Sequence, residues 1–238
     1  MAYDEIKALT FDTGGTILDW HSGFRDAFAE VGRAHGIERD WAQMANRLRR
    51  RSLRKMINQG EHEPPTYNID GAHRLALEEL LEEHDLTQFD EQQRHQIAYV
   101  APHSFTCWPD FVGGLEQLRT RRLCASFTIL SYRLIMDTAR ENGVVWDAVF
   151  SCEGIGKYKM LPEPYERVAH FLQLEPAQIL MVASHHFDLD AAADVGYKTA
   201  HVQRPTEWGG EALEDPQPRH QRDISVSGFS ELAALLNA

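Results

Sequence analysis

The sequence has few cysteines and no long apolar run. Its 238 residues include only Cys107, Cys124 and Cys152, none of them at a C-x-x-C spacing. An odd, sparse count of cysteines predicts no disulfide framework and favours a reducing compartment. No stretch approaches the ~18 consecutive apolar residues of a membrane span. The opening segment, MAYDEIKALTF, lacks the basic-then-apolar pattern of a signal peptide, so we expect a cytoplasmic protein.

Positive charge is also scarce. The chain has 24 Lys and Arg against 36 Asp and Glu, a net charge of −12. Such a surface repels nucleic acid and anionic membranes, so neither is an expected partner. Residues 47–55 reverse this field locally, because their sequence RLRRRSLRK is mostly basic. This segment is a candidate for contact with a small anion.

Short apolar runs alternate with amphipathic segments over most of the chain. The runs predict strands at 6–11, 124–130, 147–152, 179–183 and 198–202. Helical patterns lie between and after them, at 112–121, 134–142, 164–172 and 189–195. This alternation indicates a doubly wound α/β domain, in which helices cover both faces of a mainly parallel sheet.

Residues 20–100 differ, because they show helical patterns and no convincing strand. These patterns lie around 21–35, 40–58, 71–84 and 90–100. Ligands of open α/β sheets bind beyond the carboxyl ends of the strands, so an all-helical insert is expected to cap that edge and exclude water. The predicted core domain is 1–18 and 101–238, and the predicted cap domain is 19–100.

Polar side chains follow three of the predicted strands. Asp12 follows the first strand, in the turn FDTGGT, whose glycines allow backbone N–H groups to face an anion. A carboxylate there can attack an electrophile and form an ester. Ser131 and the segment SHHFD (184–188) follow two later strands. Taken singly, Asp12 could instead cap a turn, and Ser131 could cap a helix.

In order and spacing, these motifs resemble those of the haloacid dehalogenase superfamily. That family combines a nucleophilic Asp, a Ser or Thr, a Lys and an acidic turn, here Asp12, Ser131, Lys159 and Asp188. Lys159 is preferred to Lys157 because it keeps the family's distances to Pro162 and Tyr165. The resemblance covers nearly the whole chain and implies a Rossmann-like core.

Two positions separate the branches of this superfamily. Its phosphatases have a second Asp two residues after the nucleophile and a magnesium-binding acid at the start of the fourth motif. Gly14 and Ala183 stand there in this sequence. Without these acids a magnesium ion loses a main ligand, and a leaving alkoxide loses its proton donor. We therefore expect neither magnesium nor any other cofactor, and no metal at the adjacent His185 and His186.

Other segments are similar to the 2-haloacid dehalogenase branch, namely LDW (18–20), WPD (108–110) and RPTEWG (204–209). That resemblance implies a metal-independent hydrolase of carbon–halide bonds, acting on a small anionic carboxylate. Asp12 would displace halide from C2 of a short 2-haloalkanoic acid. Water would then hydrolyse the aspartyl ester to give a 2-hydroxy acid.

The resemblance also implies roles for the site residues. Lys159 would keep Asp12 ionised, and Asp188 would orient Lys159 and the hydrolytic water. Ser131 and the backbone of the turn would bind the substrate carboxylate. The predicted catalytic residues are Asp12, Thr16, Ser131, Lys159 and Asp188. The predicted contacts of substrate and halide are Thr13, Gly14, Arg49, Tyr132, Tyr165, Ser184, His185 and Phe187, the last as an apolar wall.

Helical periodicity selects Arg49 among the basic residues of 40–58. At about 100° per residue, Arg49 is the one basic side chain on the arc that holds Met44, Leu48 and Met56. Burying a guanidinium without a partner is costly, so an anion is the expected partner. Its place also matches the cap arginine of the resembled branch. The alternative is that Arg49 pairs with a core acid or extends its head to solvent.

Three departures from that branch keep other functions open. Gly14 replaces a common aromatic residue, and Tyr132 and His185 replace asparagines. The Tyr132 phenol could donate to halide. One alternative is a hydrolase or phosphatase of another small anion, and another is an inactive descendant that binds small carboxylates. Dimers are common among relatives of this kind, so a homodimer also stays open.

Overall fold

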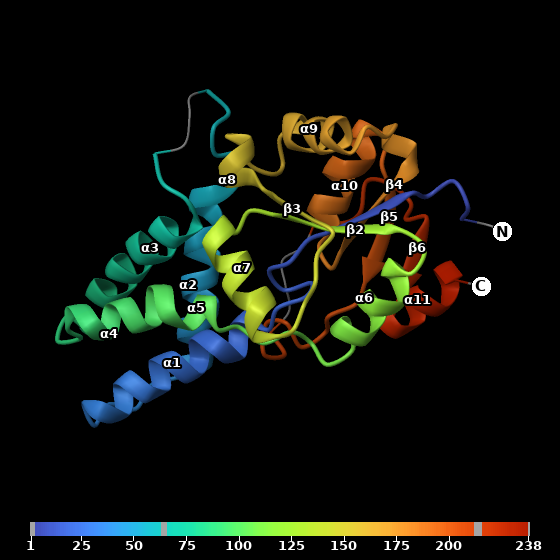
Figure 1. Cartoon of the computed structure of the whole chain (residues 1–238). Coiled ribbons are helices and arrows are strands. Elements are labelled where there is room, and N and C mark those ends of the chain that lie inside the picture. Colours follow the sequence, from blue (N-terminus) through green and yellow to red (C-terminus); the bar gives the residue numbers. More distant parts are fainter. Residues whose placement is uncertain (1–2, 63–65, 212–215, 238) are drawn as a thin grey trace.

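The computed structural model describes residues 3–62, 66–211 and 216–237. Within these ranges, the strands form a single sheet in the order β3-β2-β1-β4-β5-β6 (Figure 1). Their bounds are β1 (Ala8–Phe11), β2 (Leu123–Thr128), β3 (Ala148–Ser151), β4 (Ile179–Ala183), β5 (Lys198–Val202) and β6 (Ile224–Val226). Every neighbouring pair is parallel, so the carboxyl ends of all these strands lie at one edge.

Helices cover both faces of this sheet. They are α6 (Phe111–Arg119), α7 (Tyr132–Glu141), α8 (Cys152–Ile155), α9 (Pro162–Leu172), α10 (His186–Val195) and α11 (Phe229–Asn237), with a 3₁₀ turn, η2 (Pro176–Gln178). In Figure 1, α6 and α11 lie on one face, and α9 and α10 lie on the other. The doubly wound α/β fold predicted from the alternation of patterns is therefore confirmed.

Aromatic side chains fill the two layers between sheet and helices. Phe11 of β1 is fully buried, with its ring centroid 6.0 Å from Phe111 of α6 and 6.0 Å from Phe229 of α11. On the opposite face, Phe127 of β2 meets Tyr165 of α9 edge to face at 5.0 Å. Burying each such ring stabilises the fold by roughly 1.5–3 kcal/mol. These contacts hold the strands whose ends carry the polar motifs.

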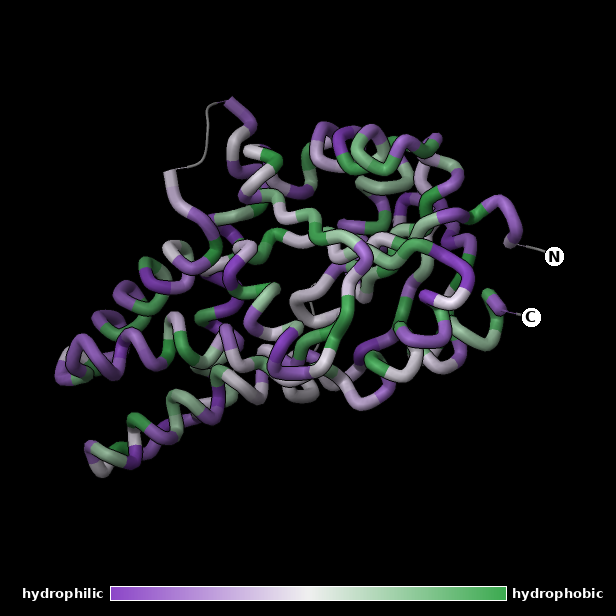
Figure 2. Tube along the Cα trace, in the orientation of Figure 1, coloured by the Kyte–Doolittle hydropathy of each residue, from purple (hydrophilic) through white to green (hydrophobic). Residues whose placement is uncertain are grey.

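Between β1 and β2 the chain is helical. The elements are α1 (Trp20–Ala34), α2 (Trp41–Met56), α3 (Ile69–Glu83), α4 (Glu91–His95), the π-helix η1 (Gln96–Val100) and α5 (Ala101–His103). They lie together beside the sheet, away from both termini (Figure 1). Hydrophilic and hydrophobic residues alternate along these helices in Figure 2, as expected where one face of each helix packs on its neighbours. The helical run continues to His103, slightly beyond the predicted limit of 100.

The predicted helices and strands do not include β6, α8, α11 or η2. β6 has only three residues, Ile-Ser-Val, and α8 has four. Such short segments carry no readable periodicity, and β6 is defined by its pairing with β5. By contrast, β4 and β5 have the predicted bounds. Within the described ranges, none of the helices has the length and apolar character needed to cross a bilayer.

Truncating the aromatic contact under β1 should destabilise the whole fold. Phe111→Ala removes a fully buried ring, and such changes cost about 3–5 kcal/mol of unfolding free energy. Phe171→Ala is the matched control, because that ring is 53% exposed and its loss should cost less than about 1 kcal/mol. Urea unfolding followed by circular dichroism measures both. Equal losses in the two variants would contradict this account of the core.

Candidate active site

The turn after β1 places Asp12 where the sheet reverses its strand order. β1 lies between β2 and β4, so the loops after β1 and β4 face each other at the carboxyl edge, where α/β sheets bind ligands. Gly15 takes a positive φ of 96°, and a side chain there would collide with the Glu207 carboxylate. A glycine is therefore needed at this point of the turn.

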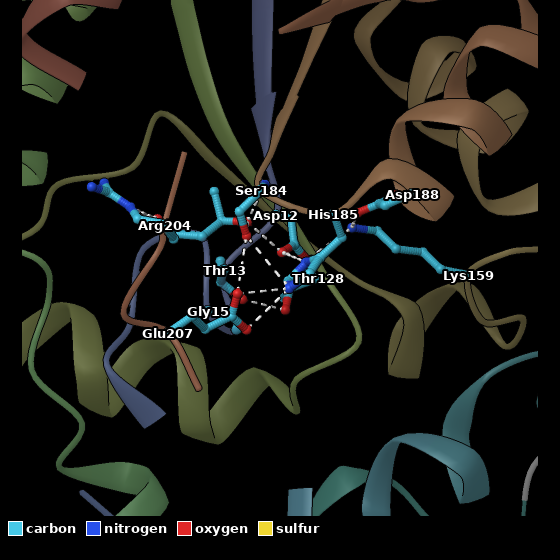
Figure 3. A network of polar contacts seen from close by, with 12 residues as sticks. Asp12, Thr13, Gly15, Thr128, Lys159, Ser184, His185, Asp188, Arg204 and Glu207 are labelled. Atoms are coloured by element: carbon cyan, nitrogen blue, oxygen red, sulfur yellow. Dashed lines mark hydrogen bonds and ion pairs between the residues drawn. The ribbon is translucent and has the colours of Figure 1, made fainter. Parts of the chain in front are cut away.

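Asp12 is buried, and three side chains contact its carboxylate (Figure 3). Oδ2 accepts from the Thr16 hydroxyl at 2.7 Å and lies 3.4 Å from Nδ1 of His185. Oδ1 lies 3.3 Å from Nζ of Lys159. Burial alone would raise the pKa of Asp12, but the charges of Lys159 and His185 and the Thr16 hydrogen bond hold it well below its usual value. The carboxylate is thus ionised and able to act as a nucleophile.

Lys159 joins Asp12 to the acidic turn at the start of α10. Its Nζ donates to Asp188 Oδ2 at 2.7 Å, and Asp188 Oδ1 accepts from the Tyr165 hydroxyl at 2.6 Å. Although burial opposes the charge, Asp188 and Asp12 raise the pKa of Lys159, so the ammonium persists. Burial raises the pKa of Asp188 itself. The structure therefore brings together Asp12, Lys159, Asp188 and Tyr165, the residues that the resemblance in Sequence analysis places in one site.

Arg49 reaches the same turn from α2. It is 3% exposed, and Nη2 donates to the Gly14 carbonyl at 3.3 Å. A Cβ on Gly14 would lie 2.5 Å from that Nη2, so the absence of a side chain makes room for the guanidinium. Burial lowers the pKa of Arg49, against the charges of Glu207 and Asp12. Its Nε has no hydrogen-bond partner within the described residues, which leaves a buried donor for an anion.

His185 is held between two carboxylates. Nδ1 faces Asp12, and Nε2 lies 3.0 and 3.1 Å from the two oxygens of Glu207. Glu207 is 3% exposed and also accepts from Trp20 Nε1 at 2.9 Å. Burial would lower the pKa of His185, but Glu207 and Asp12 raise it to about 10. Glu207 was not predicted from the sequence; its one signal was its place in the segment RPTEWG.

The remaining predicted residues divide into those near Asp12 and those tied elsewhere. Ser184 bonds to Thr16, with 3.1 Å between the hydroxyl oxygens, and Phe187 stacks on His185 with the ring centroids 5.2 Å apart. Thr13 bonds instead to Thr128 of β2, with 2.5 Å between their hydroxyl oxygens.

Ser131 and Tyr132 begin α7 and are tied to other partners. The Ser131 hydroxyl donates to Asp70 of α3 at 2.7 Å and accepts from Leu134 N, so it caps α7. Tyr132 is 37% exposed and packs over Gly154. Within the described ranges, neither side chain forms a hydrogen bond with Asp12, so neither belongs to the group of side chains around that carboxylate.

The residues around Asp12 do not fit a magnesium ion. Magnesium requires several oxygen donors in octahedral array. Here the cationic Lys159 and His185 occupy the oxygens of Asp12, and Arg49 occupies the carbonyl of Gly14. Ala183 offers no side-chain donor at the end of β4. Among the described residues, no group of three or more His, Cys, Asp or Glu could hold a metal ion.

Comparisons of this chain with a family model and with known proteins agree on one family. A family model described as a haloacid dehalogenase-like hydrolase matches residues 6–196. The protein named (S)-2-haloacid dehalogenase 1, from Pseudomonas sp. (strain CBS-3), is 27% identical over 244 residues, covering 98% of this chain and 97% of that protein.

Solved structures agree in fold and in length. A defluorinating L-2-haloacid dehalogenase is 32% identical with a TM-score of 0.88, covering 98% of this chain and 96% of that one. Another L-2-haloacid dehalogenase is 29% identical, also with a TM-score of 0.88, covering 98% and 99%. The likeness extends over the sheet and the inserted helices alike.

The position of His185 between two acids predicts an unusual titration. Because its pKa is raised to about 10, both ring nitrogens should stay protonated at pH 8 in nitrogen-15 NMR, with the signal assigned by its loss in His185→Asn. The charge should stabilise the fold below the usual histidine pKa of about 6.5, and this contribution should fade as pH rises through about 10. A ring that titrates near its usual value would refute the assignment.

Proposed function

The chain belongs to the haloacid dehalogenase-like hydrolase family, and on this premise we propose that it removes halide from short 2-haloalkanoic acids, giving 2-hydroxy acids. The observation that carries the proposal is the ionised Asp12, surrounded by Lys159, His185 and Arg49 where a phosphatase needs acids and a metal. The names of the relatives support the same reaction.

In the first step Asp12 attacks C2 of the substrate. A carboxylate oxygen forms a bond to carbon while the carbon–halogen bond breaks, and the halide leaves with the bonding electrons. The leaving halide requires no proton, so the absence of an acid at position 14 is no obstacle. Among the described residues, Nε of Arg49 is a buried donor without a hydrogen-bond partner, which suits Arg49 to stabilise the departing anion.

In the second step water hydrolyses the aspartyl ester. Asp188 orients the water and accepts its proton, which it then returns to the departing alkoxide. The raised pKa of the buried Asp188 favours this transfer, and Lys159 bridges the two acids. No metal ion takes part in either step. The nucleophile Asp12 and the base Asp188 thus come from segments that follow two different strands, β1 and β4.

The substrate carboxylate is assigned to Ser131 and to backbone N–H groups of Thr13 and Gly14. The Ser131 hydroxyl donates to the Asp70 carboxylate, so substrate binding there would exchange one carboxylate acceptor for another. Asp70 lies on α3, one of the inserted helices, so this exchange would also alter a contact between the insert and α7.

We assign residues 19–100 to a cap over a core of 1–18 and 101–238. Two contacts from α2 support it: Arg49 donates to the Gly14 carbonyl, and Asn46 Nδ2 donates to the Trp208 carbonyl at 3.1 Å. Both acceptors lie in loops at the carboxyl edge of the sheet. A cap held there excludes water from the first step and so favours attack at carbon.

Halide release tests the proposal directly. The wild-type protein should release halide from at least one of fluoro-, chloro- or bromoacetate or the two 2-chloropropionate enantiomers, equally with and without EDTA. Asp12→Asn should release none, because the nucleophile is lost. Magnesium-dependent release of phosphate from an aryl phosphate, without halide release, would instead indicate a phosphatase. Halide release retained in Asp12→Asn would refute the assignment of Asp12 as the nucleophile.

A charge-preserving change on α2 tests the role of Arg49. Arg49→Lys keeps the charge but loses the planar fork, and kcat/KM for halide release should fall roughly 100-fold, about 3 kcal/mol. The matched control is Arg47→Lys on the outer arc of the same helix, where Arg47 is 38% exposed and pairs with Glu83. That variant should keep wild-type kinetics. Equal effects in the two variants would count against a special role for Arg49.

A further inference from the structure

The two oxygens of Asp12 have different surroundings. Oδ2 is bonded by the Thr16 hydroxyl at 2.7 Å and faces His185 Nδ1 at 3.4 Å. Oδ1 has a single neighbour of this kind within the described residues, Lys159 at 3.3 Å. An oxygen that attacks carbon needs a lone pair aimed at the substrate. Fewer lone pairs of Oδ1 are therefore engaged by donors, whereas Oδ2 has two donors beside it.

The imidazole of His185 is fixed in place from both ends. A neutral imidazole has one N–H, yet here each ring nitrogen faces a carboxylate, Asp12 on one side and Glu207 on the other. Glu207 is itself held by Trp20 Nε1 at 2.9 Å and by the Ser184 hydroxyl at 3.4 Å. A distance of 3.4 Å from Nδ1 to Oδ2 leaves no space for a water between them, so the ring acts on Oδ2 directly.

We infer that Oδ1 of Asp12 is the attacking atom, and that His185, held as an imidazolium by Glu207, stabilises the charge that develops on Oδ2 when the aspartyl ester is hydrolysed. This inference rests on the proposed function, because it requires the ester. In this inference His185 contacts the nucleophile Asp12, whereas its place in the motif had suggested a contact with substrate or halide. Glu207 acts through His185 and is a positioning residue.

The second step forms a bond between water and Cγ of Asp12 and breaks the Cγ–Oδ1 bond. The water oxygen bonds to Cγ of Asp12, one water proton passes to Asp188, and the Cγ–Oδ2 π pair moves onto Oδ2, facing Nδ1–H of His185 and the Thr16 hydroxyl. The pair then returns, the Cγ–Oδ1 bond breaks, and the alkoxide takes the proton from Asp188. The remaining proton of the new carboxyl group leaves to solvent, which restores the Asp12 carboxylate.

His185 should therefore act on the two steps unequally. During alkylation Asp12 loses charge, so a donor on Oδ2 stabilises the starting carboxylate and gives no acceleration. During hydrolysis Oδ2 gains charge, so the same donor stabilises the transition state. Removal of a single donor of this kind costs about 100- to 1000-fold in rate. The ester should then accumulate when His185 is replaced.

The test is rapid-quench kinetics on His185→Ala, which leaves no side-chain donor, with a substrate that the wild type turns over. We expect a burst of about one halide per protein, then turnover slowed at least about 100-fold. Mass spectrometry should find the carboxyalkyl ester on the peptide that contains Asp12. The matched control His186→Ala changes the adjacent histidine, whose ring faces His201 with the centroids 4.5 Å apart, and should behave as wild type. His185→Ala turning over as wild type, or losing burst and turnover equally without an ester, would overturn the inference.

The pH profile tests Glu207 separately from a structural role. The charged groups around His185 are Asp12 after β1, Glu207 after β5, Arg49 on α2 and Lys159 before α9. Hydrolysis should fall as pH rises through the pKa of His185 in the ester, which lies below the value of about 10 in the free protein because the Asp12 charge is lost on alkylation. Glu207→Gln should move this fall to still lower pH, because a second stabilising charge is lost. The same decline should be absent in His185→Ala. If the rate of hydrolysis in Glu207→Gln falls at the same pH as in the wild type, the proposed role of Glu207 is wrong.

Failure of this inference can be told from failure of the proposed function. Wild-type protein that releases no halide from any haloacid would refute both. Wild-type protein that releases halide and forms the ester on Asp12, with no accumulation of the ester in His185→Ala, would refute the inference alone. Circular dichroism and urea unfolding of each variant separate kinetic loss from loss of fold.

Discussion

A balance of buried charge holds the carboxyl edge of the sheet together. Burying a single ion is costly, and its removal leaves its partner uncompensated. Three carboxylates and three cations meet here, namely Asp12, Asp188 and Glu207 with Lys159, Arg49 and His185. Asp12 contacts two of the cations, Lys159 and His185, so its ionisation depends on residues that are far from it in the sequence. The charge of Asp12 is a property of this group, not of the turn alone.

The two glycines of that turn make the balance sterically possible. Gly14 leaves space for the Arg49 guanidinium, and Gly15 leaves space for the Glu207 carboxylate, each of which a Cβ would displace. The same pair of residues thus makes room for one cation and one anion beside the turn that carries Asp12. Gly14 therefore provides neither a carboxylate nor any side-chain volume. The space that a side chain would fill is occupied by the Arg49 guanidinium of α2.

The inserted helices are part of the site as well as its cover. α2 contributes Arg49, and α1 begins with Trp20, which donates to Glu207 and lies edge to face with Trp208 at 4.7 Å. Without these helices the site would lose Arg49, and the Glu207 carboxylate would lose its hydrogen bond from Trp20. The charge state of His185 therefore depends on α1 through Trp20 and Glu207.

By itself, the sequence determined the local and periodic features: the strands β4 and β5, the acid after the first strand, and the apolar arc that buries Arg49. Each depends on neighbours within a few residues, so one pattern suffices. Only the tertiary structure decided that His185 bridges Asp12 and Glu207, and that Ser131 bonds to Asp70. Those contacts join loops far apart in the chain, and no spacing records them, because the parallel sheet and the insert create the distances between their atoms.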